Sequence, residues 1–441
     1  MKRILFCAAA VVIAFAIPHA QQPSEIELRI SGEPGTPPRY AVPEFVALTP
    51  DAAEAARTMT QVLWDDLGFE REFYMVPRDT YSTVRQARTP DQVDFAGWRE
   101  LGADAVVFGS VSRSGNTITV QVRLFGVRSR QAVFSKEYNG SVANPRLYAH
   151  TMADEIHQQQ RNLRGVARTK LAFTSDRNRE RIAGPVANRD VKEISIADYD
   201  GANQRRITTS RQLNLTPSWS PDARAIAYTS YRRGYPDIFV ALLYQGIQEE
   251  PTKGVGQNYL PVWSPDGTRM AFMSNRDGNP EIYVMNRDGS GVRRLTNNPA
   301  IDVTPTWSPT GTQIAFTSDR AGTPQIYVMG IDGLNLRRIT TNESWADRPT
   351  WAPAPYNEIA YAGRTGPGYD IKVYDLASGQ VRQITFGEGS NESPAYSPTG
   401  RHLAFVSTRS GFEQVFTMAR DGRNVKQITR DGRNTTPAWS N

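Results

Sequence analysis

The chain has 441 residues, of which 39% are hydrophobic and 22% are charged, and its formal net charge at pH 7 is +6. This length gives room for two or three domains, and the composition is that of a globular protein rather than a disordered one. The basic residues are scattered singly along predicted turns instead of forming a block, which argues against nucleic acid or anionic lipid as the main partner.

The first twenty residues have the pattern of a secretory signal peptide. Two basic residues precede an apolar run from Ile4 to Ile17, and the small residue Ala20 follows just before a polar stretch. This apolar run is shorter than the roughly 20 residues that a bilayer-spanning helix needs. We therefore predict cleavage near residue 20, with an uncleaved anchor as the alternative. The only cysteine, Cys7, lies inside this segment, so the exported chain would have no disulfide bond.

Residues 34–165 predict a small α/β domain. Apolar residues recur at helical spacing over 51–67, and Thr49 with Pro50 gives an expected helix cap and first-turn proline. The other predicted elements are strands at 105–111 and 117–125, a helix at 146–161 and a linker at 162–169. This order of helices and strands favours a mixed sheet.

A repeated unit fills the second half of the chain. An aromatic residue recurs about every 44 residues, and each repeated unit has four short β-type runs, the first of which contains the aromatic residue; Asp-Gly or Thr-Gly pairs form turns within the units. Four-stranded units of this length are typical of β-propeller blades. The aromatic positions are Trp219, Trp263, Trp307, Trp351, Tyr396 and Trp439.

The two ends of the repeat predict how the ring closes. The first copy of the second strand begins near Leu171 without an aromatic strand before it, whereas the last aromatic strand, Pro437–Ser440, ends the chain. We therefore predict an α/β N-terminal domain followed by an all-β six-bladed propeller at 170–441, closed by the C-terminal strand. Two irregular segments, 178–190 and 244–253, are either special loops or tolerated surface variation.

The sequence contains no recognisable catalytic or metal-binding pattern. His150 and His157 lie seven residues apart on a predicted helix, His402 lies on a turn, and no Gly-x-Ser-x-Gly elbow occurs. The segment 198–201 is interpreted as an ordinary Asp-Gly turn, and the Ser-x-Arg pattern repeated in nearly every blade as structural hydrogen bonding. We therefore predict no catalytic residues, no metal ligands and no cofactor.

Several segments resemble the TolB family of periplasmic propellers in the Tol–Pal system. They are 94–109 in the front domain, 146–156 in the helix before the propeller, 198–201, and the terminal Pro437–Ser440. The resemblance implies a periplasmic adaptor that links a Pal-like lipoprotein to a TolA-like inner-membrane protein and supports outer-membrane integrity and cell division. It implies no nucleic acid partner and only peripheral membrane association through these partners.

The resemblance also implies two binding regions. The TolA-like partner would bind a flexible segment at 21–33, although its alternating pattern also fits the first strand of the α/β domain. The residues implied for TolA binding are Glu25, Ile26, Glu27, Leu28, Arg29 and Ile30.

For the Pal-like lipoprotein, the resemblance implies propeller loops near the central channel, which we expect just before each innermost strand. The residues implied are Gln257, Asn258, Leu260, Asp302, Val303, Asp347, Arg348 and Glu392. Gln257 replaces a family histidine and Leu260 replaces a small residue, which weakens the transfer of single residues but not the choice of face. The alternatives are a propeller enzyme or small-ligand-binding protein, such as a lyase, lactonase or peptidase relative, or independent binding of carbohydrate or peptidoglycan.

Overall fold

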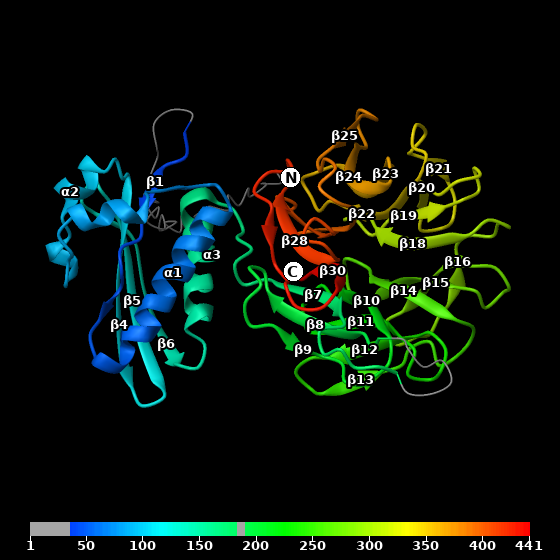
Figure 1. The fold of residues 1–441 in the computed structure, drawn as a ribbon, viewed down its shortest axis with the longest axis horizontal. Helices are drawn as coiled ribbons and strands as arrows, with labels where there is room; N and C mark the ends of the chain where they lie inside the picture. Colours follow the sequence, from blue (N-terminus) through cyan, green and yellow to red (C-terminus); the bar gives the residue numbers. More distant parts are fainter. Residues whose placement is uncertain (1–35, 183–189) are drawn as a thin grey trace, which may run out of the picture.

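The computed structural model describes residues 36–182 and 190–441. A small α/β domain lies beside a ring of β-sheets, and helix α3 faces the ring (Figure 1). The predicted signal peptide at 1–20 and the predicted partner-binding segment at 21–33 lie outside the described residues. Among the helices of the described part, none combines the length and the hydropathy that a membrane span requires.

The α/β domain is built on a mixed sheet, as predicted. Its strand order is β3-β1-β4-β5-β6, with β2 paired to β4; β1, β2 and β3 run parallel in their pairings, whereas β4, β5 and β6 are antiparallel. The strands are β1 (Arg39–Ala41), β2 (Val46–Ala47), β3 (Tyr74–Met75), β4 (Ala105–Ser114), β5 (Thr117–Gly126) and β6 (Ala132–Ser141). The helices are α1 (Ala53–Phe69), α2 (Phe95–Glu100) and α3 (Pro145–Arg161), with short 3-10 turns η1 (Pro50–Ala52), η2 (Arg78–Thr83) and η3 (Pro90–Gln92).

Helix α1 confirms the predicted helix but begins differently from the prediction. Its apolar face is buried, with Met59 and Leu63 fully inaccessible to solvent. The Thr49 side chain makes no capping hydrogen bond; its hydroxyl oxygen accepts from the backbone N–H of Arg113 at 3.1 Å. The helix begins instead through the η1 turn, where Pro50 occupies the first position.

The propeller has the six predicted blades. The first strands of successive blades contact one another around the ring and form its inner wall (Figure 1). From innermost to outermost strand, the blades are β30 (Asn434–Trp439), β7 (Lys170–Ser175), β8 (Glu193–Asp198) and β9 (Arg205–Arg206); β10 (Asn214–Trp219), β11 (Ala225–Ser230), β12 (Asp237–Leu242) and β13 (Ile247–Glu249); β14 (Asn258–Trp263), β15 (Arg269–Ser274), β16 (Glu281–Asn286) and β17 (Arg293–Arg294); β18 (Asp302–Trp307), β19 (Gln313–Ser318), β20 (Gln325–Gly330) and β21 (Arg337–Arg338); β22 (Ala346–Trp351), β23 (Glu358–Thr365), β24 (Gly368–Asp375) and β25 (Val381–Gln383); β26 (Asn391–Tyr396), β27 (His402–Ser407), β28 (Gln414–Ala419) and β29 (Lys426–Gln427).

The C-terminal strand closes the ring, as predicted. Strand β30 pairs antiparallel with β7, and Trp439 lies opposite Leu171. The indole N–H of Trp439 donates to the hydroxyl of Thr169 at 2.7 Å, which fixes the last strand to the start of the propeller. The pairing joins both ends of the domain and covers what would otherwise be an open sheet edge.

The repeated Ser-x-Arg pattern is structural, as predicted. In the fourth blade of the chain, the Nε–H of Arg320 donates to Ser318 Oγ at 2.8 Å and an Nη2–H donates to Asp302 Oδ2 at 2.7 Å. The same guanidinium lies 5.5 Å from the ring centroid of Phe316 and 5.0 Å from that of Tyr327. Arg177, Arg276 and Arg409 make the equivalent bonds to Asn434, Asn258 and Asn391, so four of these arginines tie the turn after a second strand to the beginning of the innermost strand.

The predicted linker at 162–169 is packed rather than loose. The backbone N–H of Val166 donates to Glu70 Oε1 and that of Ala167 donates to Asp154 Oδ1, both at 2.9 Å. Burial raises the pKa of Glu70 to about 7, although Arg401 of the propeller lies 2.8 Å from its other oxygen. One continuous apolar core joins α1, α3 and the adjoining blades, so the two domains form one packed unit.

The irregular segments keep the blade architecture. Within 244–253, strand β13 still forms the fourth strand of its blade, and Tyr244 beside it is 75% exposed. In the 178–190 insertion, Arg181 and Asp190 form an antiparallel bridge at the two sides of residues 183–189, which the structure does not describe.

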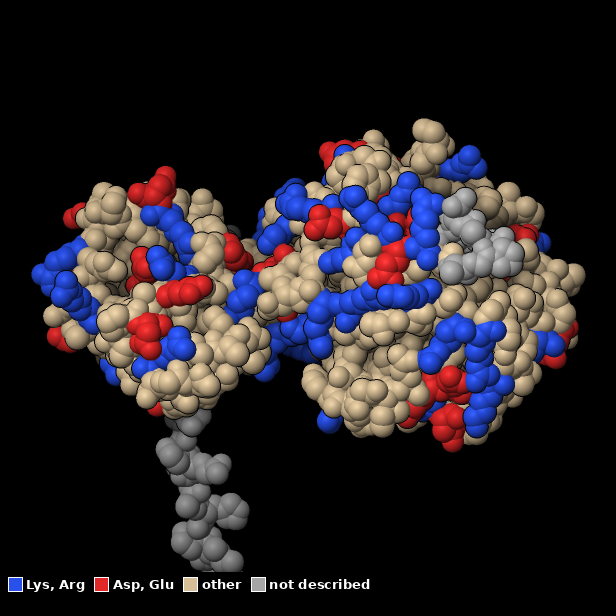
Figure 2. Space-filling model, turned by 60° about the horizontal axis from the view of Figure 1, so that its bottom comes forward, with Lys and Arg blue, Asp and Glu red and all other residues tan. Residues whose placement is uncertain are grey.

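Lysine and arginine side chains are conspicuous on the side of the molecule seen in Figure 2, particularly over the propeller. Many are already occupied by carboxylates. For example, Arg206 pairs with both Glu180 and Glu193, and Arg233 pairs with Glu250. Much of the local positive charge on this face is therefore balanced by neighbouring carboxylates.

Candidate functional site: the channel mouth and the domain junction

Each innermost strand carries the same β-bulge near its start. The third residue of the strand has a left-handed backbone and precedes proline, and the pairing register shifts there. The third residues are Thr216, Leu260, Thr304, Arg348, Ser393 and Thr436. Six equivalent bulges therefore form a ring around one end of the channel, which we call the channel mouth.

The residues expected at the Pal-binding face gather at this mouth, but not all in the expected position. Only Gln257 precedes an innermost strand; the other seven lie within the first three residues of their strands. The sequence analysis expected the innermost strands to begin after these residues. In the structure the strands begin earlier, because their pairing starts before the bulge, with Asn258 opposite Ser274 and Asp302 opposite Ser318.

Two of these residues are completely buried. An Nη2–H of Arg276 donates to Asn258 Oδ1 at 3.0 Å, while the Asn258 amide donates to Asp237 Oδ1 at 2.9 Å. Asp302 is paired with Arg320, and burial raises the pKa of Asp302 above its ordinary value despite this cation. Both side chains therefore shape the mouth from beneath the surface.

The other predicted residues are exposed or half-buried and divide the mouth into two sectors. Leu260 and Val303 give one sector an apolar surface, whereas Asp347, Arg348 and Glu392 give the neighbouring sector its charges. Asp347 Oδ1 accepts from the Thr317 hydroxyl of the preceding blade at 2.9 Å. The carboxylate is thus oriented while the residue remains 29% exposed.

The sequence prediction missed three side chains at the channel mouth, one at the start of a strand and two in loops. Tyr259 follows Asn258 and donates from its hydroxyl to Gln257 Oε1 at 3.0 Å. Ile301 and Phe386, in the loops before β18 and β26, are 47% and 70% exposed. An apolar residue in a polar loop just before an innermost strand is the signal that could have identified Ile301 and Phe386.

The second feature is a buried polar cluster between the domains. The segment 198–201 forms the predicted turn, with Gly201 at φ +93°, but it also contacts the α/β domain. The hydroxyl of Tyr199 donates to Asp66 Oδ1 at 2.7 Å, and the other oxygen of Asp66 lies 2.8 Å from His150 Nδ1. All three side chains are at least 96% buried, so interpreting this segment as an ordinary turn was incomplete.

Charges around His150 determine its protonation. Burial opposes the charged ring, but the nearby carboxylates of Asp198 and Asp66 outweigh burial and raise the pKa of His150 to about 9. His150 Nε2 lies 3.7 Å from Asp198 Oδ2, and Arg146 forms an ion pair with Asp200 in the same cluster. A charged histidine between two carboxylates therefore joins α1 and α3 to the propeller.

The two other histidines of the described residues, His157 and His402, are structural. Burial lowers the pKa of His157 to about 4 and that of His402 to about 3, so both rings are neutral at pH 7. His402 stacks on Phe69 at 4.3 Å between ring centroids, across the domain boundary. Within 36–182 and 190–441, no group of three His, Cys, Asp or Glu residues is arranged to hold a metal ion.

Family comparisons agree with both domains. The family described as TolB amino-terminal domain matches residues 26–133, and the family described as TolB beta propeller domain matches residues 159–440. The chain belongs to the TolB family. Members of the TolB family are periplasmic components of the Tol–Pal system.

Individual relatives support the same assignment. The Tol-Pal system protein TolB of Cereibacter sphaeroides is 32% identical over 250 residues, covering 55% of this chain and 54% of the relative. The TolB protein of Desulfosudis oleivorans is 34% identical over 207 residues, covering 46% of this chain and 45% of the relative. These alignments span about half the length of the curated relatives.

Solved structures extend the likeness over both domains. The crystal structure of TolB from Acinetobacter baumannii is similar with a TM-score of 0.76 at 26% identity, covering 93% of this chain and 98% of that one. A chain from a nidogen/laminin complex has a TM-score of 0.50 at 12% identity, covering 62% of this chain and 98% of that one, which is a likeness of fold alone. The α/β domain therefore separates the TolB family from propellers in general.

Proposed function

We propose that the chain is a periplasmic adaptor of the Tol–Pal system that binds a Pal-like lipoprotein at the channel mouth and a TolA-like protein through residues 21–33. The observation that carries the proposal is the separation of the channel mouth from the docked α/β domain. This domain contacts Tyr199, Arg401 and His402, which lie in or beside turns at the ends of the strands opposite the mouth. Because each innermost strand runs from the mouth to that other end, docking leaves the mouth free.

The two sectors of the mouth suit a protein surface of mixed character. Leu260, Val303 and the exposed Phe386 offer apolar area, and Asp347 with Glu392 offers two carboxylates. Protein interfaces combine an apolar centre with charged groups that set orientation and association rate. A lipoprotein domain with a basic patch beside an apolar knob would match this pattern.

The test is a calorimetric titration of residues 21–441 with the soluble domain of the Pal-like lipoprotein from the same organism. We expect saturable one-to-one binding, weakened at least tenfold by Glu392→Lys or Asp347→Lys. Glu249→Lys, on the exposed outermost strand β13, is the matched control and should leave the affinity unchanged. Absence of binding by folded protein, or equal loss in the control, would refute the proposed site.

The TolA-like partner is tested separately, because its segment lies on another part of the chain. Deleting residues 21–33 should abolish TolA binding while leaving the unfolding midpoint unchanged. An unchanged TolA affinity would contradict the assignment of Glu25 to Ile30 as the binding segment.

We further propose a binding role without catalysis, in line with the curated relatives, which are named as Tol–Pal system proteins. Metal analysis of purified protein tests this point. A stoichiometric metal whose removal abolishes a measurable activity would instead favour a propeller enzyme.

A further inference from the structure

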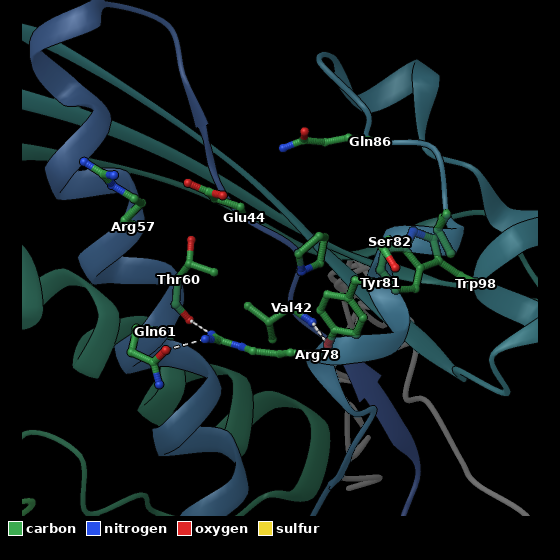
Figure 3. Close-up of a pocket in the computed structure, with 12 residues that line it drawn as sticks. Val42, Glu44, Arg57, Thr60, Gln61, Arg78, Tyr81, Ser82, Gln86 and Trp98 are labelled. Atoms are coloured by element: carbon green, nitrogen blue, oxygen red, sulfur yellow. Dashed lines mark hydrogen bonds between the residues drawn. The ribbon is translucent and has the colours of Figure 1, made fainter.

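A cleft of about 700 Å³ opens in the α/β domain between α1 and the η2 segment, and none of its lining residues belongs to the channel mouth. Arg57, Thr60 and Gln61 line it from α1, and Tyr81 and Ser82 face them from the other side (Figure 3). The chain from Val42 to Glu44, which joins β1 to β2, lies between these walls. This volume lies in the usual range for small-molecule sites.

The two walls are held together by one arginine. Arg78 extends from η2 toward α1 (Figure 3), where its guanidinium donates to the side-chain carbonyl of Gln61 and to the backbone carbonyl of Thr60 at 2.9 Å. The same group lies 5.1 Å from the ring centroid of Trp64. The spacing between the walls is therefore fixed without a bound ligand.

The wall opposite α1 is aromatic and equally fixed. Tyr81 packs edge-on against Trp98, with 4.9 Å between ring centroids. The Tyr81 hydroxyl donates to Val76 O at 3.1 Å and accepts from Val42 N at 3.0 Å. Trp98 and Val84 are more than 90% buried, so this side of the cleft offers a preformed apolar surface.

Two opposite charges lie at the other end of the cleft. Arg57 on α1 and Glu44 on the connection after β1 are both exposed, and the side chains lie near each other, apart from Tyr81 and Trp98 (Figure 3). Within the described residues, neither side chain forms an ion pair or hydrogen bond. The cleft therefore presents a free cation and a free anion at one end and aromatic rings at the other.

We propose that this cleft binds an α-amino-acid zwitterion with an apolar or aromatic side chain. Its carboxylate would pair with the Arg57 guanidinium, whose planar fork suits a carboxylate, and its ammonium group with Glu44. Its side chain would lie against Tyr81 and Trp98. Because an amino acid carries both charges on one carbon, a single ligand satisfies both groups at the charged end.

The test is an isothermal titration with three probes that differ only at the charged end: L-phenylalanine, N-acetyl-L-phenylalanine and L-phenylalaninamide. We expect saturable one-to-one binding of L-phenylalanine and at least tenfold weaker binding of the other two. Arg57→Ala and Glu44→Gln should each lower the affinity for L-phenylalanine at least tenfold. The matched controls Arg123→Ala and Glu54→Gln, at exposed positions outside the lining, should bind as the unmodified chain does.

The blocked probes distinguish the two contacts. N-acetyl-L-phenylalanine lacks the ammonium group, so its affinity should no longer fall on Glu44→Gln but should still fall on Arg57→Ala. Urea midpoints of all variants should match that of the unmodified chain. Absence of saturable L-phenylalanine binding, or binding that neither variant changes, would overturn the proposal without bearing on the adaptor function.

Discussion

Replacing His150 by glutamine should remove a pH-dependent part of the stability of the domain junction. The pKa of His150 rises from its ordinary value of 6.5 to about 9 in the folded protein, since nearby carboxylates outweigh the effect of burial. A rise of this size corresponds to about 3 kcal/mol of folding free energy. Because the pKa is raised, this stabilisation is fully present below pH 6.5 and is lost as the pH rises through about 9.

The assay is urea unfolding between pH 6 and pH 10, followed by circular dichroism. The free energy of unfolding of the unmodified chain should fall by about 3 kcal/mol relative to His150→Gln across this range. Titrating groups that do not contact His150, including Glu70, cancel in the difference between the two proteins. His157→Gln is the matched control, because the pKa of His157 is lowered to about 4 and its ring stays neutral throughout.

Parallel pH profiles for the unmodified chain and His150→Gln would refute the reasoning. They would mean that the ring is neutral in the folded state, or that the cluster of Asp66, Asp198 and Tyr199 contributes nothing that depends on its charge. A pH-dependent difference that His157→Gln reproduces would refute it as well.

Three further predictions concern the propeller. Asp302→Ala should lower the free energy of unfolding by about 3–5 kcal/mol because it removes the buried carboxylate partner of the half-buried Arg320, whereas Glu392→Ala should change it by less than about 0.5 kcal/mol; urea unfolding distinguishes them. Gly289→Ala should destabilise more than Gly278→Ala in thermal unfolding, because both have positive φ but only Gly289 would place its Cβ 2.0 Å from a backbone oxygen. Trp439→Ala should lower the free energy of unfolding in urea by about 3–5 kcal/mol, because Trp439 helps to close the ring. A loss below about 1 kcal/mol would contradict this role of Trp439.

The architecture could be predicted from the sequence because the pattern of one blade is repeated along the chain. Aromatic residues at a constant spacing predicted the blades, and the unmatched strands at Leu171 and Trp439 predicted how the ring closes. Each copy supports the others, so local ambiguity in one blade does not change the result. The packed linker was less predictable, because its order depends on Glu70, just after helix α1, and on Asp154 of helix α3.

The functional positions were predicted in outline but not in detail. Burial of Asp302 at the start of its strand depends on Arg320 reaching back from the following turn, which spacing alone does not indicate. The contact of Tyr199 with Asp66 joins residues 133 positions apart, so it arises only when the domains dock. Local patterns identified the turn and the loops, whereas their exposure and partners came from tertiary packing.

The central claim is that one chain carries two partner sites, and we propose in addition that binding at one site weakens binding at the other. The most direct measurement is calorimetric titration of the TolA-like domain into residues 21–441, with and without saturating Pal-like lipoprotein. The account predicts binding in both cases, with an affinity lowered about 5- to 150-fold by Pal, and the same factor when the order is reversed. Equal TolA affinities with and without Pal would contradict the coupling, and failure of either partner to bind would contradict the adaptor function itself.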